Sequence, residues 1–357
     1  MHEVDFGHNQ SVGLELLDSI ARLPEDVTAL AIRAANPFAS REWIQTWWKH
    51  FGADREPVVG VLRDGVGNLQ VIVPIYVWRR HPLRMARFVG HGPGDYLGAV
   101  HAPADREAAA RALADTLAAA ECHALLAERL PGDSPLPTGW TAYPLLEESS
   151  PTLALDAGSW DEFLASRSSN FRQQVRRRER NLARDHDLRF RLTQGPDTFD
   201  EDFETLDRLH TARWGEDAPN AFADADQPCH RDFAALALER GWLRLWTMEL
   251  DGRPVACWHG LRFGGVEWYY QAGRDPAFDS QAVGFVLLAH TVREAMADGM
   301  TAYSFLRGDE PYKDRYGPEP FQVRTCVAGR GMRGRAAALA AAGGSKLPEG
   351  LRQRALD

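Results

Sequence analysis

Apolar positions recur with two different spacings in the first part of the chain. Residues 14–34 and 42–51 carry an apolar side chain every three to four positions, and Ser40 could cap the second stretch, so both are predicted to be helical. Short apolar runs at 58–62 and 69–77 flank a glycine-containing turn, which is typical of a β-hairpin. Together with a later alanine-rich, helix-favouring stretch, these elements predict an α/β region.

The second part combines the same elements in a more regular order. After a helix-rich segment, apolar runs at 242–250, 255–263 and 266–272 are joined by Asp-Gly and Gly-Gly turns, which predict an antiparallel meander. A helix over 283–298 and a strand over 301–306 follow. The predicted order is therefore helix, meander, loop, helix, strand.

A proline-rich stretch divides these two parts. Five prolines fall within 131–151, and 357 residues exceed what one hydrophobic core usually organises. We therefore expect an N-terminal domain over 1–150, a C-terminal domain over 151–328 and a tail over 329–357. The tail is rich in alanine, glycine and arginine, and we expect a loosely held helix or no fixed structure there.

Composition limits the classes of partner. The formal net charge of −9 argues against a protein whose main partner is bulk nucleic acid or an anionic membrane. The first residues show no signal-peptide pattern, and no stretch has the roughly 18 consecutive apolar residues of a membrane span, so we expect a soluble, cytoplasmic protein. The four cysteines lie far apart without metal-site spacing, which favours reduced, packed thiols and no metal site.

The loop before the helix at 283–298 is the first candidate for chemistry. A helix N-terminus carries unpaired N–H groups and the positive end of the helix dipole, and both favour a phosphate or pyrophosphate. The candidate cofactor-binding residues are Gln281, Ala282, Val283, Gly284 and Phe285.

An arginine-rich helix is predicted near the start of the C-terminal domain. Its basic side chains include Arg172, Arg176, Arg177, Arg180 and Arg184. Three interpretations remain open for them: a solvated helix face, a phosphate site, or a contact with nucleic acid.

Several motifs together resemble one family. They are Pro37-Phe38-Ala39-Ser40-Arg41-Glu42-Trp43 with Trp47-Trp48, Gly92-Pro93-Gly94-Asp95-Tyr96, the arginine-rich helix, Gly252-Arg253-Pro254-Val255-Ala256, and Phe305-Leu306-Arg307-Gly308-Asp309-Glu310-Pro311-Tyr312-Lys313. Over residues 36–317 the chain resembles the GNAT superfamily of N-acyltransferases, and more narrowly the bacterial CelD-like acetyltransferases. The chain departs from the family pattern at Ser304, where an Asp is common, and at 282–284, where Ser-Pro-Gly is common.

The resemblance implies a fold and a reaction. The fold would be α/β of the mixed α+β type: a tandem GNAT-like arrangement of two mixed sheets flanked by helices. The reaction would be direct attack of a small-molecule amine on the thioester of an acyl-CoA, which serves as co-substrate without a metal. Such a reaction needs a base for the amine, a hydrogen-bond donor for the oxyanion and an acid for the leaving thiolate.

The resemblance also suggests roles for individual residues. Tyr312 would be the general acid, with Tyr316 as the second choice, and Asp309 or Glu310 would be the base or amine anchor. The remaining candidates would bind substrate; they are Arg307, Lys313, Gln271, Tyr270 and His259.

Two other functions remain open. One is aminoacyl transfer from aminoacyl-tRNA, as in Fem-type transferases with the same duplicated fold, and the arginine-rich helix is the feature that favours it. The other is a degenerate GNAT-like domain that binds a ligand without turnover, which the altered residues Ser304 and Ala282 allow.

Overall fold

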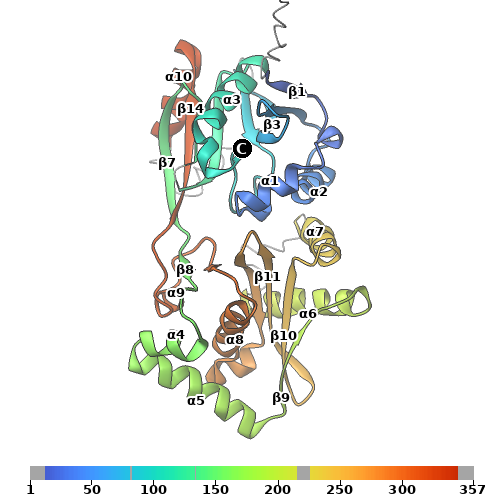
Figure 1. The fold of residues 1–357 in the computed structure, drawn as a ribbon, viewed down its shortest axis with the longest axis vertical. Helices are drawn as coiled ribbons and strands as arrows, with labels where there is room; N and C mark the ends of the chain where they lie inside the picture. The colour runs from blue at the N-terminus through green and yellow to red at the C-terminus, as the bar shows by residue number, and fades with distance from the viewer. Residues whose placement is uncertain (1–12, 81–82, 133, 215–225, 345–357) are drawn as a thin grey trace, which may run out of the picture. The chain divides into compact units, whose positions relative to one another are not determined.

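The chain folds into two compact α/β units. The structure, a computed structural model, describes residues 13–80, 83–132, 134–214 and 226–344 (Figure 1). Unit 1 comprises Met1–Ala34, Phe38–Leu146 and Arg324–Asp357, and unit 2 comprises Ala35–Pro37 and Glu147–Val323. Each unit has one mixed sheet flanked by helices, as expected for the fold class.

Unit 1 is built on an eight-stranded sheet in the order β1-β2-β3-β4-β6-β14-β7, with β5 paired to β3. The strands are β1 (Glu15–Leu17), β2 (Glu56–Arg63), β3 (Leu69–Arg80), β4 (Leu83–Phe88), β5 (Val100–His101), β6 (Ala124–Pro131), β7 (Thr141–Ser149) and β14 (Gln322–Gly329). The helices are η1 (Ile20–Arg22), α1 (Val27–Arg33), η2 (Pro37–Ala39), α2 (Arg41–Phe51), η3 (Pro103–Asp105), α3 (Arg106–Ala119) and α10 (Gly331–Gly344).

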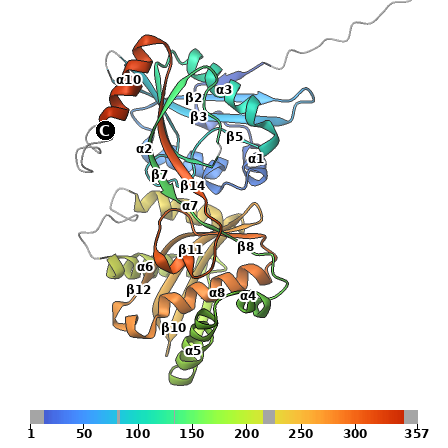
Figure 2. The same cartoon turned by 90° about the vertical axis from the view of Figure 1, so that its left-hand side faces the viewer.

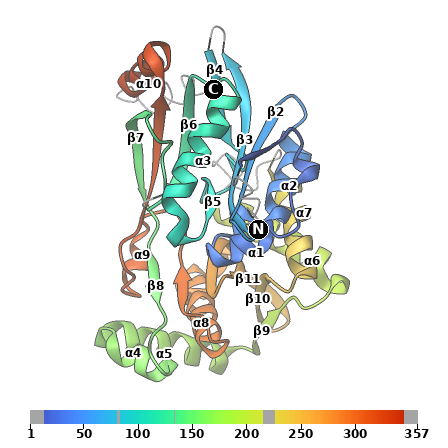
Figure 3. The ribbon, with the colours of Figure 1, turned by 45° about the horizontal axis from the view of Figure 1, so that its top comes forward.

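In unit 1 the predicted capped helix and the predicted β-hairpin are both present. The Ser40 hydroxyl accepts the Trp43 N–H at 3.2 Å and caps α2, which buries Trp43 and Trp47. The hairpin of β2 and β3 has the expected antiparallel register. β4 pairs in parallel with β6, and the connecting helix α3 packs on β2 and β3 (Figure 3).

Unit 2 is built on a six-stranded sheet in the order β8-β13-β12-β11-β10-β9. The strands are β8 (Thr152–Ala154), β9 (Leu188–Leu192), β10 (Leu243–Leu250), β11 (Arg253–Phe263), β12 (Val266–Arg274) and β13 (Ala302–Ser304). The helices are α4 (Trp160–Ser166), α5 (Ser169–Asp185), α6 (Pro196–Trp214), α7 (Gln227–Glu239), η4 (Pro276–Gln281), α8 (Val283–Ala297) and α9 (Pro311–Asp314).

The predicted meander is the centre of unit 2. β10, β11 and β12 pair antiparallel, and β13 returns parallel to β12 for three residue pairs. α8 packs on β11 and β12, and α5 packs on α8. The apolar face of α8, with Val283, Val286, Leu287 and Val292, is buried in the core of this unit.

One sequence prediction for unit 1 fails in part because tertiary contacts override local preference. Residues 14–34 are not helical throughout: β1 pairs with β2, and only η1 and α1 are helical. The proline-rich stretch 131–151 contains strand β7, and the division between the two units, after Leu146, lies within it.

The end of the chain, including the residues beyond the expected limit of 328, belongs to unit 1. β14 lies between β6 and β7 in the sheet of unit 1 (Figure 2), and α10 packs on β6. Gly334 permits this contact, since a Cβ there would lie 2.0 Å from the His123 carbonyl oxygen. The described part of the tail is thus a helix docked on unit 1.

Among the residues that the structure describes, no helix is both long and apolar enough to cross a membrane.

Candidate functional site

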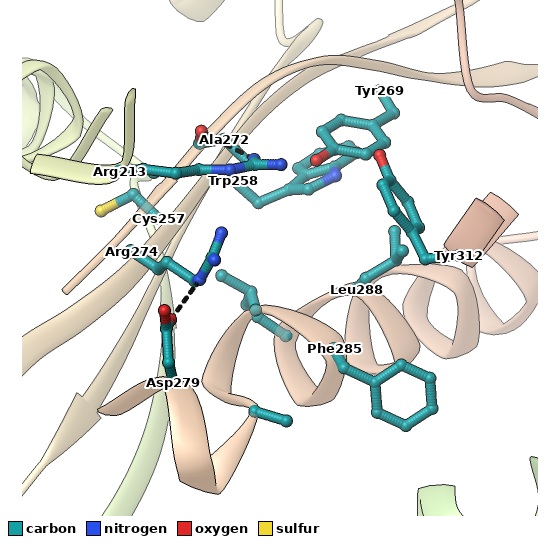
Figure 4. Close-up of a pocket in the computed structure, with 14 residues that line it drawn as sticks. Arg213, Cys257, Trp258, Tyr269, Ala272, Arg274, Asp279, Phe285, Leu288 and Tyr312 are labelled. Atoms are coloured by element: carbon teal, nitrogen blue, oxygen red, sulfur yellow. Dashed lines mark hydrogen bonds and ion pairs between the residues drawn. The ribbon is translucent and has the colours of Figure 1, made fainter. Parts of the chain in front are cut away.

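Unit 2 contains a cavity of about 410 Å³ between β11, β12 and the start of α8 (Figure 4). Its lining comprises Arg213, Cys257, Trp258, Tyr269, Ala272, Gly273, Arg274, Asp279, Ala282, Gly284, Phe285, Leu287, Leu288 and Tyr312. The volume falls within the range of about 300–1,000 Å³ that is usual for small-molecule sites. Polar groups lie at its two ends, and aromatic and aliphatic side chains lie between them.

One end of the cavity is the N-terminus of α8. The N-cap Ala282 has left-handed φ and ψ angles of 56° and 45° and supplies no side-chain cap, so the first N–H groups of the helix have no side-chain acceptor there. Gly284 keeps the backbone open, because a Cβ there would meet only the Arg274 side chain, at 3.4 Å. A non-glycine residue in this conformation is strained, and such strain often marks a binding site.

Cationic side chains lie at the same end. Arg274 ends β12, and its Nε donates to Asp279 Oδ1 at 2.6 Å. Arg213, from α6, donates from Nη1 to the Ala272 carbonyl at 3.3 Å. The first turn of α8 contains no acidic residue. Two guanidinium groups and a helix N-terminus therefore favour an anion at this end.

The middle of the cavity is apolar. Trp258, Leu287 and Leu288 form its walls, and the sulfur of the fully buried Cys257 points away from it (Figure 4). Burial raises the pKa of Cys257 to about 12, and its Sγ lies 3.5 Å from the Thr247 hydroxyl. Cys257 is thus a protonated, packed thiol and not a nucleophile.

The other end of the cavity holds two tyrosines. The hydroxyls of Tyr312 and Tyr269 point toward each other in the cavity (Figure 4). Burial, reinforced by Tyr269, raises the pKa of Tyr312 well above its ordinary value. The Tyr312 hydroxyl therefore keeps its proton throughout the physiological range and can donate a hydrogen bond to a group in the cavity.

A β-bulge orients Tyr269 toward the cavity. Gln271 pairs with His259, but the next pair is Tyr269 with Gly260, so Tyr270 is the extra residue. The hydroxyl of Tyr270 lies 3.2 Å from His230 Nδ1 on α7. Neighbouring tyrosines of one strand therefore have different partners.

Several predicted residues contribute to this cavity and several do not. Tyr312, Ala282, Gly284 and Phe285 line it. Gln281 is exposed, and Val283 is buried in the core beneath the loop. Asp309 is exposed and Glu310 is half-buried, and neither lines the cavity.

The structure shows what holds the predicted substrate-binding residues Lys313 and Arg307. Lys313 is 2% exposed, and its Nζ donates to the carbonyls of Arg307 at 2.9 Å and Gly308 at 3.1 Å and pairs with Glu310 at 2.8 Å. Arg307 pairs with Glu148 at 2.8 Å. Both residues thus hold the loop before Tyr312, in which Leu306 has a positive φ of 52°.

The other predicted substrate residues lie outside the cavity lining. Gln271 Oε1 is 3.2 Å from His210 Nε2 on α6, and Tyr270 contacts α7. His259 is 1% exposed, and within the described chain neither of its ring nitrogens has a hydrogen-bond partner. Burial lowers the pKa of His259 to about 3, so its imidazole is neutral.

Sequence reasoning missed the two cavity arginines. Arg274 could have been found, because it is a basic residue at the end of the strand that precedes the donor loop. Arg213 could not, because its position depends on α6 packing against β12 at Gly273, where a Cβ would lie 2.3 Å from the His210 backbone nitrogen. Among the residues that the structure describes, no cluster of His, Cys, Asp and Glu side chains could hold a metal ion.

Comparison with known proteins identifies a domain in this unit. Residues 169–314 match the family model for the acetyltransferase (GNAT) domain. No curated protein matches the sequence.

Solved structures are similar over most of the chain. FemX superposes with a TM-score of 0.60 at 12% identity, covering 88% of this chain and 96% of that chain. The C-terminal domain of a provisionally assigned lysylphosphatidylglycerol synthetase from Agrobacterium fabrum has a TM-score of 0.55 at 14% identity, with coverages of 90% and 95%. A conserved protein of unknown function from Bacteroides thetaiotaomicron has a TM-score of 0.54 at 12% identity, with coverages of 89% and 100%. At these identities the similarity concerns the fold.

Proposed function

We propose that this chain, an acyltransferase of the GNAT superfamily, transfers an acyl group from acyl-CoA to the amine of a small molecule by direct attack. The observation that carries the proposal is the cavity of unit 2. It connects an anion-favouring helix N-terminus with a protonated tyrosine pair through an apolar passage. A CoA thioester has the same sequence of properties: phosphates, a largely uncharged arm and a reactive thioester.

The donor would lie with its pyrophosphate at Ala282 and Gly284. Backbone N–H groups of α8 and the Arg274 and Arg213 guanidinium groups supply the positive charge, while Asp279 orients Arg274. Trp258 and Leu288 would enclose the arm. The thioester would then reach Tyr312.

The reaction needs no covalent enzyme intermediate. The amine nitrogen forms a bond to the thioester carbonyl carbon, the C–S bond breaks, and the proton lost by the amine balances the proton gained by the thiolate. Because the pKa of Tyr312 is raised far above the roughly 8.5 of a free thiol, Tyr312 acts by donating a hydrogen bond to the developing thiolate rather than by lasting proton loss.

The acceptor side would use residues next to Tyr312. We assign the base to Glu310, whose carboxylate contributes to the raised pKa of Tyr312 and is therefore close to it. The exposed Asp309 would attract the cationic amine.

One observation favours a second donor, an aminoacyl-tRNA. In α5 the side chains of Arg177, Arg178 and Arg180 make no ion pair within the described residues, whereas Arg176 pairs with Asp161 at 2.9 Å. Unpaired arginines along a helix suit a phosphate backbone. The resemblance to Fem-type transferases supports the same alternative.

Thiol release distinguishes the two donors. Purified protein is mixed with acetyl-, hexanoyl- or palmitoyl-CoA and with glucosamine, lysine or spermidine, and free CoA thiol is measured against a Tyr312→Phe variant. Tyr312-dependent thiol release is expected with at least one acyl-CoA. Aminoacyl transfer from labelled aminoacyl-tRNA that needs Tyr312, together with no such thiol release, would overturn the proposal.

A further inference from the structure

A second cluster of aromatic and charged side chains lies in unit 1, around the Gly92-Pro93-Gly94-Asp95-Tyr96 motif. The rings of Trp47 and Tyr76 stack at 5.7 Å with an angle of 24°. Trp47 Nε1 donates to the His91 carbonyl at 2.8 Å, and the Tyr76 hydroxyl lies 3.1 Å from His91 Nδ1. Trp47 and Tyr76 are almost completely buried. The donor and acceptor groups of this aromatic cluster are thus already used within unit 1.

Three guanidinium groups surround the cluster. Arg55, Arg87 and Arg129 are all close enough to His91 to lower its pKa electrostatically, in addition to the larger effect of burial, and its pKa falls to about 3. The imidazole of His91 is therefore neutral and adds no charge of its own.

Only two of these three arginines face a carboxylate within the described part of unit 1. Arg87 Nε lies 3.5 Å from Glu128, and Arg129 Nη1 lies 3.9 Å from Asp95. Arg55 has no ion pair or hydrogen-bond acceptor for its side chain among the described residues, and its Nη1 is closed to solvent. One positive charge of the cluster is unmatched.

The surroundings of Arg55 hold the guanidinium in place without satisfying it. Its Cζ lies 5.0 Å from the Trp47 ring centre and 4.8 Å from that of Tyr76. Such contacts are favourable, but they accept no N–H hydrogen bond in the plane of the guanidinium. A charged donor without an acceptor is costly when it is removed from water, so the guanidinium gains from any acceptor that reaches its open groups.

The neighbouring loop is strained in the way that ligand sites often are. Arg129 has a positive φ of 50° and donates to the carbonyls of Gly92 and Gly94. Gly90 has a φ of 106°, and a Cβ there would lie 3.0 Å from Trp43 Nε1. The chain thus accepts backbone strain to fix this loop beside the arginines.

We propose that Arg55 is the anion-recognition residue of a second ligand site, located in unit 1, and that its ligand is a small molecule bearing a carboxylate. One unmatched charge suits a monoanion. Of the guanidinium nitrogens only Nη1 is closed to solvent, so the edge formed by Nε and Nη2 stays open. A planar carboxylate accepts from such an edge in bidentate geometry. The half-buried side chain leaves access from solvent. The inference stands independently of the acyl donor and of the cavity in unit 2.

The test uses the full chain labelled with ¹⁵N at arginine and titrated with sodium acetate, with sodium chloride at equal ionic strength as reference. We expect the Arg55 Nε resonance to shift saturably with acetate and not with chloride. Arg55→Gln should lose any acetate-dependent rise in melting temperature. Arg55→Lys keeps the positive charge but loses the planar pair of N–H donors, and it should weaken acetate binding by about tenfold.

Arg63→Gln is the matched control, because Arg63 is also in unit 1 but already pairs with Asp26 at 2.8 Å. It should retain the full acetate response. Equal responses of the wild type and Arg55→Gln, or an Arg55 resonance that acetate moves no more than chloride does, would overturn the proposal. If Arg55→Gln fails to fold, the Arg55→Lys variant and the wild-type titration still decide it.

Discussion

The two units share a connection order but differ at the helix that follows the meander. In unit 1, β2, β3 and β4 form the meander, α3 follows, and β6 returns parallel to β4. In unit 2, the same places are taken by β10, β11, β12, α8 and β13. α3 and α8 therefore occupy corresponding positions in the two sheets.

The two helix N-termini differ in charge. α3 begins at the N-cap Asp105 and has Arg106 and Glu107 in its first turn, whereas the first turn of α8, after Ala282, has no charged residue. Asp105 also lines a cavity of about 390 Å³ together with Asp26, Asp64 and Arg33, so acids outnumber the basic residue there. Acidic residues compensate the helix dipole at α3 and would repel a phosphate, while the N–H groups at α8 and the nearby Arg274 attract one.

Under the proposed function, duplication of the fold has not duplicated the donor site. The backbone supplies a helix N-terminus in both units, and the side chains decide which one can bind an anion. We therefore assign donor binding to unit 2 and a different, carboxylate-binding role to unit 1. The following changes test this division.

The largest effect on kcat is expected at Tyr312, one of the two tyrosines in the cavity of unit 2. Tyr312→Phe removes the hydrogen bond to the leaving thiolate and should lower kcat by roughly 100- to 10,000-fold, while donor affinity stays the same. Steady-state thiol release and calorimetric titration with CoA measure the two quantities. Tyr316→Phe is the control: the Tyr316 hydroxyl is buried without a partner in the described structure, so its loss should leave both quantities unchanged. Equal losses in the two variants would contradict the assignment.

The next largest effect is expected at Lys313, which anchors the loop that carries Tyr312. Lys313→Met leaves the Arg307 and Gly308 carbonyls without their donor. Displacement of a catalytic group by about 1 Å costs on the order of 100-fold, so kcat should fall by about 10- to 100-fold with little change in donor Kd. The exposed Lys49, in unit 1, gives the control Lys49→Met. A raised acceptor KM at constant kcat would instead make Lys313 a substrate-binding residue.

A smaller effect is expected at Arg274. Arg274→Gln removes one charge from the phosphate end of the cavity and should weaken CoA binding by about tenfold, or about 1.4 kcal/mol, in a calorimetric titration. Arg253→Gln changes an exposed arginine of β11 that pairs with Asp275 and does not line the cavity. The Arg253→Gln variant should bind CoA as the wild type does. If it lost as much CoA affinity as Arg274→Gln, the net charge of the protein and not the position of Arg274 would account for the effect.

The smallest effect concerns acid stability. Burial lowers the pKa of His259 and His290 to about 3 and of His210 to about 4 in unit 2, and of His91 to about 3 in unit 1. Because these histidines stay neutral when folded, only the unfolded chain takes up protons below about pH 6.5. The contribution of these neutral histidines to the free energy of unfolding is fully present above that pH and decreases as the pH drops toward 4.

His290 offers a variant for this prediction, since its ring stacks on Phe190 at 3.9 Å outside the cavity. The melting temperature should be lower at pH 5 than at pH 7, and His290→Phe should reduce that difference by the contribution of one proton. A pH dependence that His290→Phe leaves unchanged would mean that His290 is already protonated in the folded state.

The sequence predicted those features that depend on neighbouring residues. The Asp251-Gly252 and Gly264-Gly265 turns fix the meander of unit 2, and apolar spacing fixes α8. Ala282, Gly284, Phe285 and Tyr312 follow from this local order and from one specific motif.

The features that the sequence did not reveal depend on contacts between distant segments. β14 pairs in the sheet of unit 1 although it begins more than 170 residues after the end of β7. Pairing between strands so far apart leaves no local pattern in the sequence. Arg213 enters the cavity only because α6 packs on Gly273. Lys313 was expected to face substrate, but the carbonyls of its own loop surround its ammonium.

Hydrogen exchange with and without acetyl-CoA tests the division between the units most directly. If the donor binds at the N-terminus of α8, amides over 282–288 and 269–274 should gain protection, while those over 104–110 at the start of α3 should not change. Protection at the start of α3, or no protection at α8 under saturating acetyl-CoA, would contradict the assignment of the donor site to unit 2.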